Sequence, residues 1–501
     1  MEYISTRGEK ILSSGAAILK GLASDGGLYV PVSFPQIDAL EIEKMCELDY
    51  AERASLILSK FLTDFDIFDL KEMCAKAYAK FENADAAPIV KVDDDAFLME
   101  LWHGPTSAFK DVALTLLPYL LTYARQSEGT NKKTLILVAT SGDTGKAALE
   151  GFADVPDTEI IVFYPSDGVS EMQKLQMQTT VGKNVNVIGI NGNFDDAQTA
   201  VKQIFKDPAT VEQIESLGYS LSSANSINWG RLAPQIAYYF SAYVDLVSSN
   251  EIKNGTPINF VVPVGNFGNV LAAYYAKKMG LPVNKLLIAS NSNNILTDFF
   301  KTGIYDTNRK FFKTISPSMD ILISSNLERL LFEISNRDPS NITKLMSEFD
   351  MYGLYEVPVN IIDEEAGEFI AYWSDEDETS EALYNFYDMF EYLLDPHTAV
   401  AVAAYFNYIA EEDDPTKTVI VSTANPYKFP QDVLNILTRR YEKDAFKAIR
   451  KLELATGIPA PDTIAELSDL SVIHTDVINK SEVKNKVLSI LHNINNAKES
   501  N

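Results

Sequence analysis

The sequence predicts an α/β protein built on parallel sheets, and three observations support this prediction. The first is length, because 501 residues are enough for roughly two to four domains with a large buried core. The second is composition, since 46% hydrophobic and 23% charged residues are typical of a soluble globular protein. The third is the alternation of short apolar runs with helical patterns, which implies parallel strands joined by right-handed crossovers.

The first 84 residues are expected to form a small N-terminal unit. Residues 21–31 read as a glycine-rich turn that leads into an extended segment. Amphipathic helical patterns follow at about 50–61 and 69–81. Residues 83–88, which end in Pro88, are a plausible boundary.

From Pro88 onward the pattern is that of an α/β domain. Apolar runs predict strands and periodic runs predict helices, and the clusters of small polar residues fall at strand ends. Strands are expected at residues 134–139, 160–165, 185–190, 258–264, 286–289 and 418–422, with helices at 147–152, 195–205 and 270–279. Ligands of parallel sheets bind at the carboxyl ends of strands, so these clusters are the candidate functional residues.

Two acidic runs, residues 373–381 and 411–415, are expected to be solvated loops. After Pro430 the chain reads as helical with mixed charge, and we expect a helical C-terminal segment there.

The charge and the cysteine content exclude several classes of function. The chain has 43 basic and 70 acidic residues, a formal net charge of −27, which argues against nucleic acid and anionic membranes as partners. Its two cysteines, Cys46 and Cys74, exclude a disulfide scaffold and fit a reducing compartment. No Cys-x-x-Cys pair occurs and the four histidines are scattered, so we expect no metal site. Residues 1–5 lack a charged-then-apolar leader and no apolar run approaches membrane length, which predicts a cytoplasmic protein.

Lys110 is the candidate nucleophile. It follows a Gly104-Pro105 turn and stands where an apolar periodic run begins, so it is expected near the start of a helix. The helix dipole there disfavours an ammonium group, and an amine that loses its proton can form a Schiff base. The alternative is an ordinary solvated lysine.

The segment Gly265-Asn266-Phe267-Gly268-Asn269 follows a predicted strand and precedes a predicted helix. Its glycines would let backbone N–H groups approach an anion such as phosphate at the helix N-terminus. The alternative is a tight strand-to-helix turn. A dinucleotide site is a weak interpretation, because the third glycine of that fingerprint and the Walker lysine are missing.

Two further turns carry polar groups. Residues 141–145 (Ser-Gly-Asp-Thr-Gly) suit either a helix N-cap or a ligand contact, which use the same N–H groups. Residues 226–231 bring Ser226, Asn228 and Arg231 together before a helix. In an acidic chain such an arginine is a candidate oxyanion clamp, and a surface salt bridge is the alternative.

These segments together resemble the threonine synthase family, which uses pyridoxal phosphate. The resemblance covers most of the chain and is carried in order by residues 3–8, 21–31, 103–111, 140–145, 225–229, 316–329 and 395–400. It implies a fold-type II architecture with two parallel-sheet α/β domains, a small N-terminal domain and a helical C-terminal segment. The implied divisions are an N-terminal domain at 1–87, a large domain at 88–135 and 226–430, a small domain at 136–225 and a C-terminal segment at 431–501.

The resemblance also implies roles for single residues. Lys110 matches the Schiff-base lysine, and Asp143 stands where the fold usually places an asparagine beside the 3′-hydroxyl of the cofactor. Thr423 matches the hydroxyl that faces the pyridine nitrogen. The cofactor phosphate is assigned to Gly265, Asn266, Phe267, Gly268 and Asn269, and the substrate to Ser141, Thr144, Ser226 and Arg231. One departure is Asn425, where the family usually has histidine.

The implied reaction converts O-phospho-L-homoserine and water to L-threonine and phosphate by γ-elimination and β-hydration. One alternative on the same scaffold is a phospho-lyase that releases 2-oxobutanoate and ammonia, and another is a cofactor-binding protein without turnover. The expected partner is the small-molecule substrate, and a monomer is the working expectation.

Overall fold

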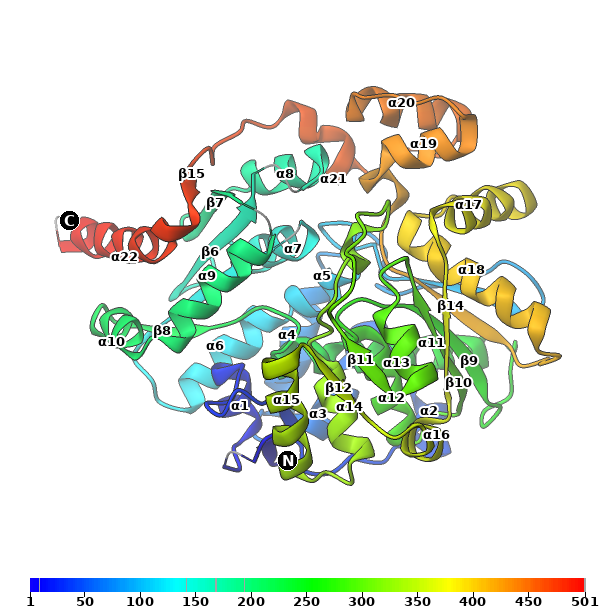
Figure 1. Cartoon of the computed structure of the whole chain (residues 1–501), viewed down its shortest axis with the longest axis horizontal. Coiled ribbons are helices and arrows are strands. Elements are labelled where there is room, and N and C mark those ends of the chain that lie inside the picture. The colour runs from blue at the N-terminus through cyan, green and yellow to red at the C-terminus, as the bar shows by residue number, and fades with distance from the viewer. Residues whose placement is uncertain (9, 141, 167–168, 193, 500–501) are drawn as a thin grey trace.

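The computed structural model describes residues 1–8, 10–140, 142–166, 169–192 and 194–499, and Figure 1 shows its two larger sheets side by side. The large sheet has the strand order β13-β10-β9-β14-β4-β3, parallel except for the β3–β4 pair. Its strands are β3 (Ile89–Lys91), β4 (Ala96–Glu100), β9 (Ile258–Pro263), β10 (Val283–Ser290), β13 (Phe369–Trp373) and β14 (Thr418–Ser422). The predicted α/β class with parallel sheets is confirmed.

The small sheet has the order β15-β7-β6-β5-β8, with every pair parallel. Its strands are β5 (Lys133–Ala139), β6 (Thr158–Pro165), β7 (Val185–Asn191), β8 (Tyr219–Ser222) and β15 (Val477–Asn479). Strand β15 comes from the segment that we expected to be helical, so the C-terminal segment completes this sheet. The predicted domain boundary between residues 135 and 136 falls inside β5, which lies in the small sheet as a whole, so we propose a boundary before residue 133.

Helices cover both faces of each sheet because alternate residues of a buried strand point to opposite sides. In β5, Leu135 and Leu137 pack with α9 and α22, whereas Ile136 and Val138 pack with α7. The large sheet is covered in the same way by α11 and α12 on one face and α18 on the other. The helices named here are α7 (Asp143–Phe152), α9 (Phe194–Lys206), α11 (Trp229–Ser248), α12 (Gly268–Lys278), α18 (Pro396–Glu411) and α22 (Val483–Glu499).

The N-terminal unit packs against α11, one of the helices that cover the large sheet. Strands β1 (Tyr3–Ser5) and β2 (Tyr29–Pro31) pair antiparallel, and α3 packs against both α4 and α11. The predicted helices correspond to α3 (Tyr50–Phe61) and α4 (Ile67–Tyr78), the second beginning two residues early because Asp66 caps it. The unit also contains α1 (Ser14–Lys20) and α2 (Ala39–Met45).

The remaining helices and strands connect the two larger sheets and the N-terminal unit, or pack around them. They are α5 (Lys110–Leu114), α6 (Leu117–Ser127), α8 (Glu171–Gln178), α10 (Pro208–Ser216), α13 (Ile295–Thr302), β11 (Ile304–Asp306), α14 (Leu327–Ile334), α15 (Pro339–Tyr352), β12 (Leu354–Glu356), α16 (Val359–Ala366), α17 (Glu376–Phe390), α19 (Pro430–Thr438), α20 (Ala445–Thr456) and α21 (Asp462–Ala465). Within the described residues, no helix combines the length and apolarity needed to cross a membrane.

The prediction of a solvated loop at residues 373–381 is wrong, because helix α17 begins there. Asp375 and Glu378 form a capping box, in which each side chain accepts a hydrogen bond from the backbone N–H of the other. Carboxylates are favoured in the first helical turn, so the acidic run starts a helix. In the run at 411–415, Glu411 is the last residue of α18 and residues 412–415 form a loop, as predicted.

Four strands from the two sheets end at the same place. The chain leaves β4 toward Lys110, β5 toward Asp143, β9 toward Gly265 and β14 toward Thr423. The carboxyl ends of both sheets therefore meet around the predicted functional residues.

One buried charge away from this place bears on stability. Glu333 on α14 has a side chain that is 7% exposed, and its nearest cation is Arg337, with 3.6 Å between Oε1 and Nη2. Burial raises the pKa of Glu333 to about 7, against the attraction of Arg337 and Lys278. Because the folded pKa lies above the unfolded value, the folded state binds the proton more tightly. The stability that this group contributes is present at low pH and is lost as the pH rises toward 7.

We predict that Glu333→Gln raises the free energy of unfolding at pH 8 by about 1–3 kcal/mol and has little effect below pH 4.5. The physical reason is that the amide removes a buried charge that is costly when ionised. Denaturation at several pH values measures this effect. Glu348→Gln, a half-exposed partner of Lys344 on α15, is the matched control. An equal effect of Glu333→Gln at every pH would contradict the explanation.

Candidate active site

The loop before α5 is shaped by one carboxylate. Asp111 accepts hydrogen bonds from the Thr106 backbone N–H at 2.8 Å and from the Thr106 hydroxyl at 2.5 Å. A Cβ atom on Gly104 would lie 2.4 Å from the Cβ of Asp111, so only glycine lets the loop close this tightly. The loop then places Lys110 at the first position of α5.

Lys110 is buried, which excludes the solvated-lysine alternative. Its side chain is 10% exposed, and its Nζ lies 3.2 Å from both Asp143 Oδ2 and Ser318 Oγ. Burial lowers the pKa of Lys110; Asp143 opposes the shift, and the positive charges of Lys428 and Arg231 reinforce it. A lowered pKa leaves more of the amine unprotonated and nucleophilic.

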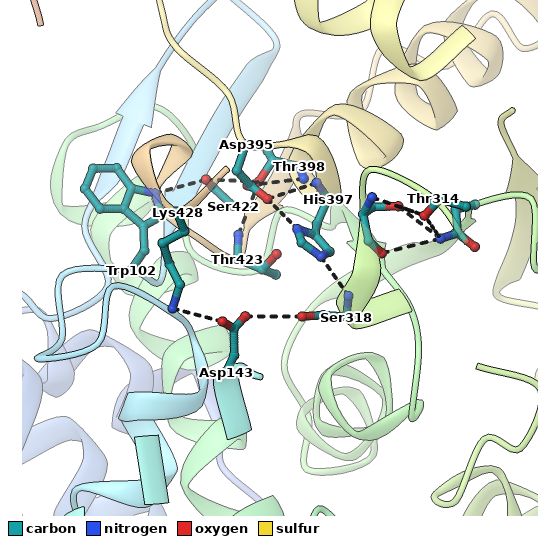
Figure 2. A network of polar contacts seen from close by, with 12 residues as sticks. Trp102, Asp143, Thr314, Ser318, Asp395, His397, Thr398, Ser422, Thr423 and Lys428 are labelled. Carbon is teal, nitrogen blue, oxygen red and sulfur yellow. Dashed lines mark hydrogen bonds and ion pairs between the residues drawn. The ribbon is translucent and has the colours of Figure 1, made fainter. Parts of the chain in front are cut away.

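Asp143, at the start of α7, contacts four polar side chains, and Figure 2 shows its contacts with Lys428 and Ser318. Oδ1 lies 3.0 Å from Lys428 Nζ and accepts from Gln173 Nε2 at 3.1 Å. Oδ2 faces Lys110 Nζ and Ser318 Oγ, each at 3.2 Å. Burial alone would raise the pKa of this carboxyl, but Lys428 and Lys110 hold it well below its usual range. Asp143 is therefore ionised.

Lys428 is a member of the site that the sequence analysis missed. Its side chain is 1% exposed, and its Nζ also donates to the Thr106 carbonyl at 2.7 Å. It lies in the short segment that follows β14, flanked by Tyr427 and Phe429. A lysine between buried aromatic residues at a strand end was the available signal, because lysine is rarely buried without a partner.

The segment 265–269 has the geometry of an anion cradle. The backbone N–H groups of Gly265, Asn266, Phe267, Gly268 and Asn269 have no acceptor among the described residues. The loop carbonyls are bonded instead: Ser324 donates to Gly265 O at 2.8 Å, and Asn326 donates to Asn266 O through its backbone N–H at 3.1 Å and its side-chain amide at 3.0 Å. A run of unpaired N–H groups at a helix N-terminus suits a phosphate group.

Thr423 lies beside the Lys110 loop, because its carbonyl accepts from the Phe109 backbone N–H at 2.9 Å. Its own N–H is bonded to the Thr398 hydroxyl at 3.3 Å. Asn425, two residues on, uses its side-chain oxygen to accept from the Tyr427 N–H at 3.0 Å. The amide therefore caps the short turn that carries Lys428.

Arg231, at the third position of α11, is 5% exposed and donates to the Ala224 carbonyl at 2.9 Å. Among the described residues no carboxylate pairs with it, and burial lowers the pKa of its guanidinium to about 10. This excludes the surface salt bridge and leaves a buried cation available to an anion. Thr144 and Ser226 are half-buried, and neither hydroxyl has a partner within the described part of the chain. Ser141 lies outside the described residues.

A second network fixes Ser318. His397 Nε2 accepts from the Ser318 backbone N–H at 3.1 Å, so its proton resides on Nδ1, which lies 2.8 Å from Asp395 Oδ1. Asp395 caps α18, and Figure 2 shows the chain of contacts from Asp395 through His397 and Ser318 to Asp143. The sequence analysis did not assign these two residues a role.

The arrangement fits pyridoxal phosphate. The Lys110 amine has a lowered pKa, and the unpaired N–H groups of residues 265–269 suit a phosphate. The segment 316–320 lies between these two features. A Cβ on Gly265 would lie 2.9 Å from the Ser318 carbonyl, and Ser318 Oγ contacts Lys110. Arg231 adds a separate buried cation for a second anion. Among the described residues no group of three potential metal ligands is present.

Comparison with known proteins agrees with this geometry. Three family models match: "Threonine synthase N terminus" over residues 2–78, "Pyridoxal-phosphate dependent enzyme" over 86–424 and "Threonine synthase, C-terminal" over 398–484. The chain is 36% identical to threonine synthase of Saccharomyces cerevisiae, covering 90% of this chain and 93% of that protein. It is 41% identical to threonine synthase-like 1 of Homo sapiens over 84% of its own length, and it spans 57% of that longer relative.

Among solved structures, threonine synthase from Brucella melitensis with bound PLP superposes with a TM-score of 0.86 at 36% identity. The match covers 98% of this chain and 99% of that one.

We predict that Gly265→Ala lowers the affinity for pyridoxal phosphate at least tenfold, because the added Cβ would push the Ser318 backbone away from the cradle. Equilibrium titration with the cofactor measures the loss. Gly129→Ala is the control, because it lies in an exposed turn with open space around it; its φ of +65° makes alanine strain that turn, but the cofactor should bind normally. Normal binding by Gly265→Ala would show that the cradle is not the phosphate site.

Proposed function

The chain belongs to the threonine synthase family of pyridoxal-phosphate-dependent enzymes, and from this premise we propose that it converts O-phospho-L-homoserine and water to L-threonine and phosphate. The observation that supports this most is the presence of two separate anion sites beside Lys110. The unpaired N–H groups of residues 265–269 suit one phosphate, and Arg231 suits another. A reaction in which cofactor and substrate both carry phosphate needs both.

Pyridoxal phosphate supplies an electron sink for the substrate's Cα. Lys110 would hold the cofactor covalently and, once displaced by substrate, would use its free amine to move protons at Cα and Cβ. Its lowered pKa suits this work, because a fully protonated lysine could not accept a proton. Asp143 and Ser318, which also contact each other, both hold its nitrogen in place.

Arg231, with Thr144, Ser226 and Ser141 as further donors, would bind the phosphate and carboxylate of the substrate. A dianionic leaving group is stabilised by donors that are already oriented, and the Ala224 carbonyl fixes the Arg231 guanidinium in advance. We assign Thr423 to the ring nitrogen of the cofactor, where a neutral hydroxyl would leave that nitrogen less protonated than a carboxylate would.

We propose that the protein acts as a monomer on its small-molecule substrate, because Asp143 contacts both Lys110 and Lys428 within the chain. We further propose a cytoplasmic location. Cys46 and Cys74 are both free thiols, which agrees with a reducing compartment.

The test of the proposed function is a product assay. Protein and pyridoxal phosphate are incubated with O-phospho-L-homoserine, and phosphate, threonine and 2-oxobutanoate are measured together. We expect threonine and phosphate in equal amounts. Phosphate with 2-oxobutanoate would replace the synthase by the phospho-lyase, and no phosphate at all would overturn both reactions.

We predict that Arg231→Gln raises the KM for O-phospho-L-homoserine about ten- to a hundredfold while cofactor binding stays normal. Glutamine keeps an amide donor but loses the charge, and a hydrogen bond to a charged group contributes about 1.5–3 kcal/mol. Arg125→Gln, which removes the partner of Asp157 on the small domain, is the control. Loss of cofactor with an unchanged KM would mean that Arg231 binds the other phosphate.

A further inference from the structure

Lys110, Asp143 and Lys428 form a row of side chains in which a carboxylate lies between two ammonium groups. The proposed reaction gives Lys428 no role. One oxygen of Asp143 faces Lys110 at 3.2 Å and the other faces Lys428 at 3.0 Å. The side chains of Asp143 and Lys428 are 2% and 1% exposed, so water screens neither charge. Asp143 comes from the small sheet's α7, whereas both lysines follow strands of the large sheet.

The charge near Lys110 depends on Lys428. The charged or titratable groups that act on Lys110 are Asp143, Lys428 and Arg231, and those that act on Asp143 are the two lysines and His397. Without Lys428, a buried carboxylate would stand beside Lys110 with one cationic partner instead of two. Such a carboxylate would hold the proton on the Lys110 nitrogen, which is the opposite of what a proton-accepting amine needs.

We propose that Lys428 is a positioning residue that cancels the charge of Asp143 and thereby lets the Lys110 nitrogen release its proton. The inference rests on the proposed role of Lys110 as the lysine that binds the cofactor. Lys428 itself reaches the site through Asp143 and has its second hydrogen bond to the Thr106 carbonyl, in the loop that presents Lys110.

The alternative is that Lys428 only fills its buried place and supports the loop. The two explanations predict different directions for the shift in the protonation of Lys110. If the pair works through charge, removing the cation and removing the anion shift the protonation of Lys110 in opposite directions, and removing both restores it. If the pair is merely structural, both single variants disturb the loop in the same way.

The experiment is a spectrophotometric pH titration of the holoenzyme, in which the visible absorbance of the cofactor bound at Lys110 reports the protonation of that nitrogen. We expect Lys428→Met to raise the midpoint by about one pH unit and Asp143→Asn to lower it, because a charge at this distance shifts a neighbouring group by about one unit or more. The double variant should return close to the wild-type midpoint. The control is Lys146→Met. Lys146 lies on the same helix as Asp143 but pairs with Glu150 instead, so this variant should leave the midpoint unchanged.

Midpoints that stay the same, or that move in one direction in both single variants, would overturn the inference. If Lys428→Met does not fold, Asp143→Asn and the double variant still decide it, since an unchanged or raised midpoint in Asp143→Asn contradicts the charge explanation. Lys110→Ala separates this failure from failure of the proposed function. Visible absorbance that survives in Lys110→Ala would overturn the role of Lys110 itself, whereas absorbance that depends on Lys110 with unmoved midpoints would overturn only the role of Lys428.

Discussion

A buried carboxylate between two ammonium groups ties the two sheets together at the place where their strands end. Asp143 belongs to the small sheet, and Lys110, Lys428 and Ser318 belong to segments of the large one. Three buried charges are expensive to desolvate, and replacing such a cluster by apolar side chains often stabilises a protein. The cluster is therefore better explained by chemistry than by stability. Much of the surrounding structure, from the Thr106–Asp111 contact to the His397–Ser318 contact, serves to hold its members still.

The fold alone brings the carboxyl ends of the two sheets together, whatever residues occupy them. Parallel strands from two sheets converge, and the chain leaves each strand through a short polar turn. One turn gives unpaired N–H groups, another presents a lysine at a helix start and a third gives a carboxylate at a helix start. Arg231, on α11, adds a buried cation without a carboxylate partner among the described residues. The proposed phosphate cradle and the proposed nucleophile thus depend on turns that the sequence patterns already indicate, whereas the second proposed anion site depends on a buried side chain.

The sequence predicts those site residues and elements that a local pattern marks, and it does not predict those that depend on tertiary packing. Lys110 and residues 265–269 could be proposed from the sequence because glycine and proline mark their turns. Lys428 could not, because a lysine in an apolar segment becomes informative only when Asp143, far away in the chain, is seen beside it. Strand β15 was missed because a strand of three residues is too short to show a periodic pattern. It forms by pairing with β7 at the edge of the small sheet, and this tertiary contact cannot be seen in the sequence. The acidic run at 373–381 was misread because its carboxylates serve as a helix start, a pattern shared with solvated loops.

The measurement that tests the central claim most directly is the site of cofactor attachment. The protein is loaded with pyridoxal phosphate, the bond to lysine is fixed by borohydride reduction, and the modified peptide is identified by mass spectrometry. The claim that Asp143 and its neighbours prepare Lys110 for this bond predicts modification at Lys110. Modification at Lys428, the other buried amine on the same carboxylate, would reverse the roles of the two lysines and contradict the account.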